Sequence, residues 1–551
     1  MIFNKTIKRF FKEYTTENRH ILIYALLFSI FQSVLLLPSV YLIKLIFDNN
    51  IPNQDLQGLL INSGSIIALT LLQSLLSIIH RNIFLKITKN AVLRLQKELL
   101  TSIIKAKKVF FDKTDQAKLV DRTVSDIETV DMMIDGLLSI IIPQITLFCI
   151  GVGIMVIYNP VIGLTTLALG IIGVLFQQKL RKSTLQSIRQ YNLTKDTLSS
   201  YVNHLSHKHV LIKMRNLESL ETVEASQYSS TMTDQGTDAA KKGWNSKVIN
   251  ELIINISATL LIVLGSVQIL LGIYSYGNIF GLYFLIVFIR RTATLIQSQW
   301  STMNLGTIAL EKIYDLHDSS IIKTSNKTPL HIDFSGNITL KNITFEYQKE
   351  QRLLNHIDFD IKRGETVLIT GANGSGKSSL INLILGFYSP LSGEIFAENT
   401  SYDSIDLGEL RSKIGYIPQQ QVLVNGTIRQ NLMFGVSSPN FLEKLKSSPI
   451  FIELIKEFQN GLETQIIQGG KNLSSGQVQR ISILRALITN PELLIMDEPT
   501  NHLDSTSIIS MVKTIKKQKD ISIIIISHHS LFKDLADKTY YLSRGNLSLI
   551  K

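Results

Sequence analysis

Long apolar runs alternate with polar, basic segments over the first 300 or so residues of the chain. A helix needs roughly 20 apolar residues to cross the hydrocarbon core of a bilayer. The intervening segments 81–135 and 179–249 are rich in Leu, Lys, Glu and Ser and poor in Gly and Pro, which also favours helix. We therefore expect six spanning helices, several continuing past the membrane and joined there by short turns, rather than two independent soluble inserts. The predicted spans are about 21–46, 58–80, 136–158, 161–178, 250–274 and 278–300.

Basic residues are confined to alternate connections between these runs. No Lys or Arg lies between Lys44 and Arg81, or in the short connections 158–161 and 274–278, whereas the two long connections contain many. Cytoplasmic loops collect positive charge. We therefore expect a multi-pass protein of the cell membrane with both termini in the cytoplasm.

The first 20 residues combine lysines and arginines with Phe10 and Phe11 and contain no cleavable signal. This pattern favours an amphipathic elbow helix lying on the inner membrane surface. The alternative is a mobile tail.

Composition supports this interpretation. Charged residues make up 18% of the chain and hydrophobic residues 45%, whereas a soluble domain is usually about a quarter charged. The net charge of +12 follows from the membrane topology, so we expect no nucleic-acid partner.

Cys149, the single cysteine, excludes an internal disulfide and is expected to be a small buried hydrophobe. Abundant Ile, Asn and Lys are typical of an AT-rich bacterial genome, hence of a bacterial inner membrane.

The pattern changes after about residue 315. A polar stretch is followed by short β-branched runs that alternate with helical ones, which is typical of an α/β domain with a mostly parallel sheet. The predicted fold is multidomain, with an all-α six-helix transmembrane domain followed by an α/β domain. Its expected parts are a membrane domain 1–315, a linker 316–334 and a second domain 335–551.

The run GANGSGKSS at 371–379 fits the phosphate-loop pattern G-x-x-x-x-G-K-[ST], between an expected strand at 366–370 and an expected helix from 378. Glycines let backbone amides turn toward phosphate oxygens at a helix N-terminus. The lysine would reach the β- and γ-phosphates, and the serine after it would ligate Mg²⁺. The candidate nucleotide ligands are Gly371, Asn373, Gly374, Ser375, Gly376, Lys377, Ser378 and Ser379.

Two further expected strands end in polar residues. The run 493–496 ends in Asp497 and Glu498, and the run 523–526 leads to His528 and His529. Ligands of parallel sheets bind at the carboxyl ends of the strands. Asp497 could hold the metal, and Glu498 could orient or deprotonate the attacking water. A histidine could contact the γ-phosphate or the water, and we favour His528.

Together with these motifs, the segment 473–477, with sequence LSSGQ, resembles the signature of the ATP-binding cassette (ABC) family in its exporter-type half-transporter form. The resemblance covers nearly the whole chain. It implies two cassettes packed head to tail, with each ATP between one phosphate loop and the other subunit's signature. It further implies that Gln419 senses the γ-phosphate and the metal and that Tyr347 stacks on adenine. The residues implied to contact the opposite site's nucleotide are Ser474, Ser475, Gly476, Gln477 and Asp504.

Segments 110–113, with Arg122 and Asp126, and 212–213 resemble the coupling segments of exporters. The chain departs from the family pattern at Ser475, where Gly is usual, and at Gln468, where Glu is usual. It also ends soon after His529, where most exporters continue with another helix. The N-terminus has no cysteine before the first span, so we expect no cysteine-peptidase domain.

The resemblance implies ATP-driven transport, most simply export of an amphipathic drug, lipid or peptide-like compound. The cofactors would be ATP and Mg²⁺, and the partners membrane lipid and a second copy or a related half-transporter. A regulatory membrane protein that binds ATP without pumping, a heterodimer half-subunit and an importer remain alternatives, whereas six spans exclude a soluble cassette protein. Arg290 and Arg291 either line a cavity for an anionic substrate or snorkel to the inner interface.

Overall fold

The computed structural model describes residues 5–15, 19–320, 330–348, 351–436, 442–443, 446–501, 503–516 and 520–551. The chain forms two compact units, residues 1–322 and 323–551, each described here by itself. We call them the membrane unit and the cassette.

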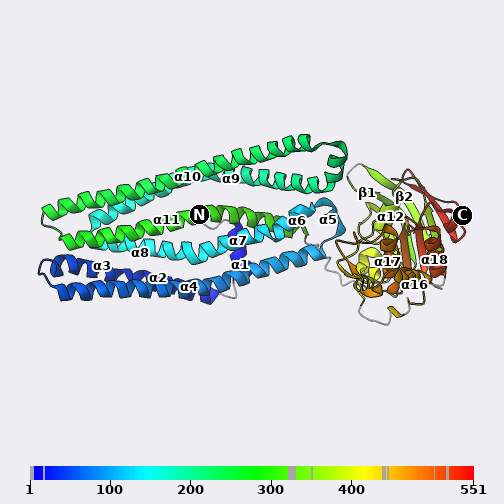
Figure 1. Cartoon of the computed structure of the whole chain (residues 1–551), viewed down its shortest axis with the longest axis horizontal. Helices are drawn as coiled ribbons and strands as arrows, with labels where there is room; N and C mark the ends of the chain where they lie inside the picture. Colours follow the sequence, from blue (N-terminus) through cyan, green and yellow to red (C-terminus); the bar gives the residue numbers. More distant parts are fainter. Residues whose placement is uncertain are drawn as a thin grey trace. The chain divides into compact units, whose positions relative to one another are not determined.

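Among its described residues the membrane unit contains six helices long and apolar enough to cross a membrane, which confirms the predicted spans (Figure 1). Polar gaps and short turns separate its elements. Their bounds are α1 Lys5–Tyr14, α2 Arg19–Val34, α3 Leu36–Leu45, η2 Ile46–Asn50, α4 Leu56–Lys105, α5 Lys108–Lys113, α6 Gln116–Thr123, α7 Ser125–Asp135, η3 Gly136–Ile141, α8 Ile142–Tyr158, α9 Pro160–Arg215, α10 Glu218–Leu270 and α11 Tyr276–Ser320.

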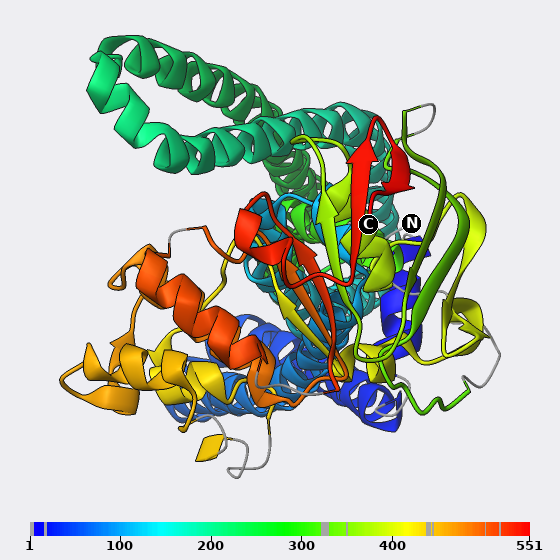
Figure 2. The ribbon, with the colours of Figure 1, turned by 90° about the vertical axis from the view of Figure 1, so that its right-hand side faces the viewer.

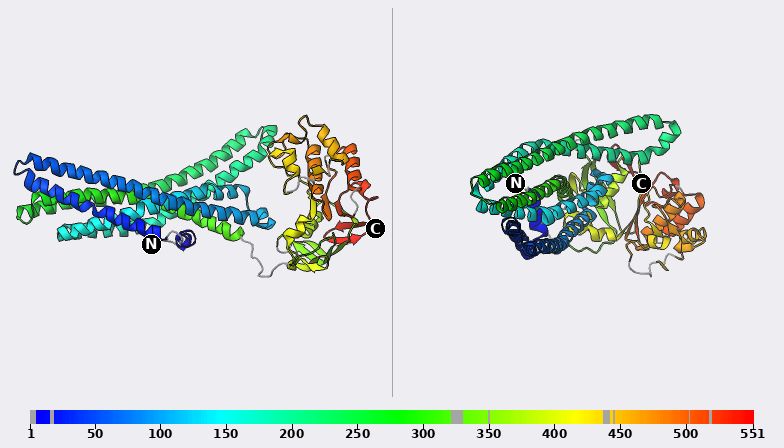
Figure 3. Two further views of the ribbon diagram at one scale, coloured as in Figure 1. Left: turned by 90° about the horizontal axis from the view of Figure 1, so that it is seen from below. Right: turned by 60° about the vertical axis from the view of Figure 1, so that its left-hand side comes forward.

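Several of these helices are much longer than a bilayer is thick. Helices α4, α9 and α10 have 50, 56 and 53 residues, or about 75–85 Å at 1.5 Å per residue. They therefore extend past the roughly 30 Å hydrocarbon core. Helices α9 and α10 run side by side (Figures 1 and 3) and are joined by Asn216, in the left-handed region at φ +52°, and Leu217.

Hydrogen bonds from polar side chains fix the helix ends that are joined by the short connections. Asp48 accepts hydrogen bonds from the Ser275 hydroxyl and, at 2.8 Å, from the Gly277 amide, which caps the start of α11. Buried Asn159 caps α9 by accepting from the Ile162 amide, and its amide group donates to Gln268 on α10 at 2.6 Å. These contacts lie where the chain leaves the apolar spans.

Cys149 is exposed on the surface of this unit, so the expectation that it is buried is wrong. It lies on α8 among apolar residues, and in a spanning helix an apolar side chain can face lipid. Hydrophobicity therefore does not predict burial here.

The expected elbow is a helix, α1, but protein rather than lipid covers its apolar face. Ile7, Phe10 and Tyr14 share one side of the helix and belong to a buried core that includes Leu99 and Leu310. The sequence predicts this apolar stripe but does not say what covers it.

Helix α11 continues through Ser320 into the segment expected to be a linker. Its last turn is held by Asp318, which pairs with Arg9, and by Ser320, whose hydroxyl donates to Ser102. Residues 321–329 of the expected linker lie outside the described residues.

The cassette is an α/β unit built on a six-stranded sheet of order β12-β11-β3-β10-β9-β6 (Figure 2). All strands but β12 are parallel to their neighbours. A four-stranded antiparallel sheet, β2-β1-β4-β5, and the small pair β7-β8 accompany it. The strands are β1 Ile338–Glu346, β2 Arg352–Ile361, β3 Thr366–Thr370, β4 Ser392–Ala397, β5 Thr400–Ser401, β6 Ile414–Ile417, β7 Gly426–Thr427, β8 Gln465–Ile466, β9 Leu493–Asp497, β10 Ser522–Ile526, β11 Lys538–Ser543 and β12 Asn546–Leu549.

Helices cover both faces of the six-stranded sheet. Alternate residues of β9 face opposite sides: Leu493 and Ile495 join the core that contains α12, whereas Leu494 and Met496 join the core that contains α17. The described helices are α12 Lys377–Ile384, α13 Leu407–Ser412, α14 Ile428–Leu432, α16 Pro449–Lys456, α17 Ser475–Ile488 and α18 Ser505–Lys516.

Candidate active site

The loop at 371–376 joins β3 to α12 at the carboxyl end of the sheet. At Gly371 any side chain would collide with the carbonyl oxygen of Leu542, 2.2 Å from the position of a Cβ atom. Gly376, the residue before α12, has φ +107°, which a side chain would strain. Asn373 and Gly374 are exposed at the rim of this loop. The glycines thus let the backbone wrap closely around a ligand.

The interior of the loop holds polar groups suited to an anion. Lys377 is buried, and its ammonium donates to the carbonyl oxygens of Gly371 at 2.6 Å and Ala372 at 2.9 Å. The buried hydroxyl of Ser375 has no hydrogen-bond partner among the described residues. An unpaired buried hydroxyl is costly, and a phosphate oxygen would satisfy it. These groups fit a phosphate-bearing ligand.

Two oxygen donors meet beside the loop. The hydroxyl of Ser378 donates to Oδ2 of Asp497 at 3.2 Å, because β3 and β9 end at the same edge of the sheet. Burial raises the pKa of Asp497, and the bond from Ser378 opposes this shift. Hydroxyl and carboxylate oxygens are suitable ligands for Mg²⁺, which usually takes its remaining ligands from phosphate and water. The residues present therefore fit this metal.

Glu498 and His528 come together at the same edge. Their Oε1 and Nε2 atoms are 3.8 Å apart. Glu498 has φ +50°, unusual for a residue with a side chain, and its amide donates to the carbonyl of Ile526 on β10. His529 instead accepts a hydrogen bond from the amide of Leu531 at the start of a short 3₁₀ turn. The structure thus places His528, and not His529, beside the glutamate.

Tyr347 is attached to the helix that follows the loop. Its hydroxyl is 3.1 Å from the Ser379 hydroxyl and accepts from the Asn382 amide at 3.2 Å. Its ring packs edge-on against Phe345 and Tyr388, with centroids 4.8 and 5.0 Å away. The ring is nevertheless almost half exposed, so one face is available for a flat ligand.

The signature segment begins helix α17. The Ser474 hydroxyl accepts from the Gln477 amide, and the Gln477 side chain accepts from the Ser474 amide, a reciprocal capping box. Gln477 also donates to Glu457, which pairs with Arg480. The side chains of Ser474 and Gln477 are therefore engaged in capping the helix, whereas Ser475 is exposed at its first turn.

The signature and the phosphate loop belong to different layers. Helix α12 lies on one face of the sheet and α17 on the other. Within the part of the chain that the structure describes, no hydrogen bond or ion pair joins residues 473–477 to residues 371–379. One cassette therefore does not bring these two motifs together.

Three other predicted residues lie apart from this cluster. Asp504 caps α18 by accepting from the Ser507 amide, and hydrogen bonds from Ser507 and Thr506 lower its pKa to about 2. Gln419 is exposed two residues after β6. Gln468 is exposed with φ +48°.

Sequence reasoning missed Asn382, Tyr388 and Glu457, which fix the tyrosine and the signature helix. No local pattern marks them, since each acts through residues distant in sequence. Asn382 could have been found by noting that it lies four residues after Ser378 and three after Ser379, on one face of the same helix.

Comparison with known proteins agrees with this geometry. Residues 354–501 match a family model described as ABC transporter, and residues 22–291 match one described as ABC transporter transmembrane region. Two similar proteins are an ATP-dependent lipid A-core flippase of Mannheimia succiniciproducens and a lactococcin-G-processing and transport ATP-binding protein of Lactococcus lactis. They are 23% and 24% identical and align with 92% and 94% of this chain and with 88% and 74% of their own lengths.

The fold also matches a solved structure, that of a bacterial Atm1-family ABC exporter with ATP bound. The TM-score is 0.88, at 19% sequence identity, over 96% of this chain and 94% of the other. The cassette and membrane unit thus occur together in a known exporter fold.

Proposed function

Since the chain belongs to the ABC transporter family, as an exporter-type half-transporter whose ATP hydrolysis is coupled to transport, we propose that it works as a homodimer. The proposal rests chiefly on the placement of α12 and α17 on opposite faces of the sheet. A second cassette, packed head to tail, would supply the signature that each phosphate loop lacks. Asp504 and the exposed first turn of α17, with Ser475 and Gly476, would then face the partner's nucleotide.

Each residue of the cluster has a role in this proposal. Lys377 and the loop amides hold the β- and γ-phosphates of ATP, with Asn373 and Gly374 at the rim and Ser375 and Ser379 inside. Ser378 and Asp497 hold Mg²⁺, with Gln419 approaching when the site closes. The metal, when bound, neutralises charge on the phosphate oxygens. Tyr347 stacks on adenine.

Glu498 is the proposed general base. Its carboxylate, held at the strand tip by the left-handed backbone, accepts the proton of the attacking water, and His528 lies close enough to orient the same water or the γ-phosphate. This pair favours a pump over an ATP-binding sensor that does not hydrolyse.

We further propose export across a bacterial inner membrane, with both termini in the cytoplasm. The membrane protein is multi-pass, and the basic residues of its long connections give the orientation. Membrane lipid surrounds the apolar exposed side chains.

The proposed substrate is a small amphipathic anion. Arg290 and Arg291 are exposed on α11, 14 and 15 residues after its first residue, and neither side chain bonds any described residue. An arginine in hydrocarbon costs about 3 kcal/mol or more unless it meets water or an anion. Phe280, Tyr283 and Val287 are exposed on the same side of the helix. An apolar stripe ending in two cations suits a lipid-like or peptide-like compound with an acidic group.

The first test is ATP hydrolysis by the purified chain in lipid nanodiscs. Wild type should hydrolyse ATP, and Glu498→Gln, which keeps the shape but not the base, should be slower by at least about 100-fold while still binding ATP. His529→Gln is the matched control and should retain most activity. A wild-type chain that binds ATP but turns over only with a related half-transporter added would replace the homodimer by a heterodimer.

Substrate charge is tested with two amphiphiles that share one acyl chain, anionic lysophosphatidylglycerol and zwitterionic lysophosphatidylcholine. Arg290→Gln/Arg291→Gln should lose at least about fivefold of the stimulation by the anionic probe and little of that by the zwitterionic one. Arg290→Lys/Arg291→Lys should keep both. Equal loss for the two probes would contradict an anion site and favour snorkelling arginines.

A further inference from the structure

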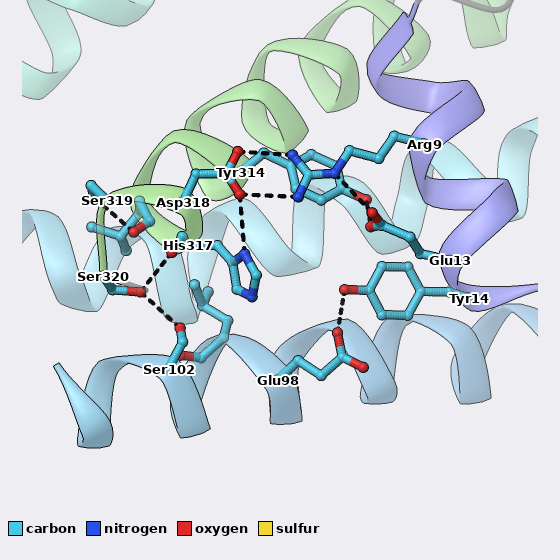
Figure 4. Close-up of polar contacts among 12 residues, drawn as sticks. Arg9, Glu13, Tyr14, Glu98, Ser102, Tyr314, His317, Asp318, Ser319 and Ser320 are labelled. Carbon is cyan, nitrogen blue, oxygen red and sulfur yellow. Dashed lines mark hydrogen bonds and ion pairs between the residues drawn. The ribbon is translucent and has the colours of Figure 1, made fainter. Parts of the chain in front are cut away.

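Helix α1 lies beside both α4 and α11 and contacts each of them (Figure 4). Its apolar side chains are withdrawn from solvent: Ile7, Phe10 and Tyr14 are 1%, 0% and 3% exposed. They share a core with Leu99 of α4 and Leu310 of α11. The apolar face of α1 therefore packs against two other helices of the same chain.

Arg9 makes the main polar contact with α11. Its guanidinium donates two hydrogen bonds to Asp318, at 2.8 and 3.0 Å, and lies 4.0 Å from the ring centroid of Tyr314. A third bond, at 2.9 Å, goes to Glu13 on α1 itself. Because the guanidinium is planar, paired with the carboxylate at two points and stacked on a ring, its geometry is fixed more tightly than that of a simple ion pair.

Two tyrosines complete the connection from both sides. Tyr14 of α1 donates to Glu98 of α4 at 2.6 Å, and Tyr314 of α11 donates to Glu13 of α1 at 2.9 Å. Directly between α4 and α11, Ser320 donates to Ser102 at 2.9 Å. The three helices are thus linked in every pairing.

This cluster lies close in sequence to the segment that joins the membrane unit to the cassette. Helix α11 ends at Ser320, and the second unit begins at Lys323. The end of α11 is therefore the part of the membrane unit that directly precedes the covalent connection to the cassette. Toward α9 the same stretch makes two ion pairs, Arg189–Glu311 and Lys312–Asp196, at 3.5 and 2.9 Å. The first is long for a charged contact, and a lysine cannot make the planar two-point contact that Arg9 makes with Asp318.

We propose that α1 is a strap that binds the end of α11 to α4, so that the two helices move as one body when the cassettes close, while the contact with α9 opens. The strap helps to transmit the closure to the outer ends of the spans, and without it the end of α11 separates more easily from α4, since only their direct contacts remain between the two helices. This goes beyond the proposed homodimer and substrate, because it concerns how one chain carries force between its own units.

The first test is hydrogen exchange of the full chain in nanodiscs. Arg9→Met, and separately the isosteric Asp318→Asn, should raise exchange of residues 310–320 about tenfold, since local opening then becomes easier. Lys8→Met is the matched control, because it removes an exposed cation from the same helix. Residues 366–370 should not change in any variant, which shows that the cassette is folded. Equal effects of Arg9→Met and Lys8→Met, or no effect of Arg9→Met and Asp318→Asn, would overturn the strap.

The second test uses a disulfide to join α4 directly to α11, so that the connection no longer depends on α1. Ser102→Cys/Ser320→Cys places two thiols where hydroxyls are 2.9 Å apart, and Cys149→Ser removes the native thiol, so oxidation can form one defined disulfide. The readout is the change in exchange at residues 51–55 and 271–275 on adding the non-hydrolysable analogue AMP-PNP.

Arg9→Met should reduce this change at least threefold in the reduced protein, and oxidation should restore it. Restoration shows that the function of α1 is to join α4 to α11. If oxidation leaves the response of Arg9→Met unrestored, α1 acts in some other way and the proposal fails. Neither outcome depends on the transported compound or on Glu498.

Discussion

The two units differ in where their apolar side chains lie: they are buried in the sheet of the cassette and often exposed on the spans of the membrane unit. In the cassette, every residue of β9 and β10 is buried, because helices cover both faces of the sheet. In the membrane unit, Ile157 and Leu270 are each 86% exposed, although they belong to the predicted spans. Polar groups also differ: those of the cassette site converge on one sheet edge, whereas those of the membrane unit are spread over many helices, at helix ends such as Asn159 and between helices such as Ser187 and Asp238. The nucleotide site is therefore concentrated in one place and the membrane contacts are dispersed.

The largest effect on activity is expected for a substitution at the centre of the nucleotide site. Lys377→Ala should lower ATP hydrolysis in nanodiscs by at least about 100-fold, because the loop then lacks the cation that we propose binds the phosphates. Lys413→Ala, at an exposed position of the same unit, should be nearly silent. A loss below tenfold for Lys377→Ala would mean that the loop amides alone suffice.

A polar contact of the membrane unit should matter for stability rather than turnover. Asn159→Ala removes both the cap of α9 and the bond to Gln268, and should cost about 1–2 kcal/mol of unfolding free energy. The measurement is unfolding in mixed micelles by added dodecyl sulfate. Thr70→Val, which removes an exposed hydroxyl bonded only within its helix among the described contacts, should cost less than about 0.5 kcal/mol. Similar losses for the two variants would remove the distinction between the helix ends and the lipid-facing surface.

The smallest effect is expected at the edge of the nucleotide site. Tyr347→Phe keeps the ring but loses the hydroxyl bonds to Ser379 and Asn382, and should raise KM for ATP about three- to fivefold with kcat unchanged. Tyr541→Phe, at an exposed position in the same unit, is the control. A fall in kcat instead would show that the hydroxyl acts on the chemistry and not on the position of the ring.

The sequence predicts the nucleotide site of the cassette better than it predicts the contacts within the membrane unit. Six spans and three strand tips could be read from short, local patterns, and the spacing around Lys377 identifies the phosphate loop without further information. The sequence favours His528 over His529 but gives no physical reason, because both follow one strand; the turn that brings His529 to the Leu531 amide leaves His528 beside Glu498. The capping role of Ser474 and Gln477 was missed, although a serine followed three residues later by a glutamine is the sequence pattern of a capping box.

In the membrane unit the pattern predicts an apolar face but not what covers it. Periodicity predicts α1 correctly yet leaves lipid and protein equally suitable as the cover for Phe10. The same ambiguity made Cys149 a wrong prediction. The roles of Arg290 and Arg291 stay predictions for this reason.

The α9–α10 hairpin is also a lever. With 56 residues, α9 is about 84 Å long at 1.5 Å per residue, so a rotation of about 5° around its Pro160 end displaces its Arg215 end by about 7 Å. Because only Asn216 and Leu217 separate the two helices, the tip travels as one piece. A rotation that moves side chains at the Pro160 end by less than the diameter of one water molecule thus moves the Arg215 end by more than the pitch of a helix.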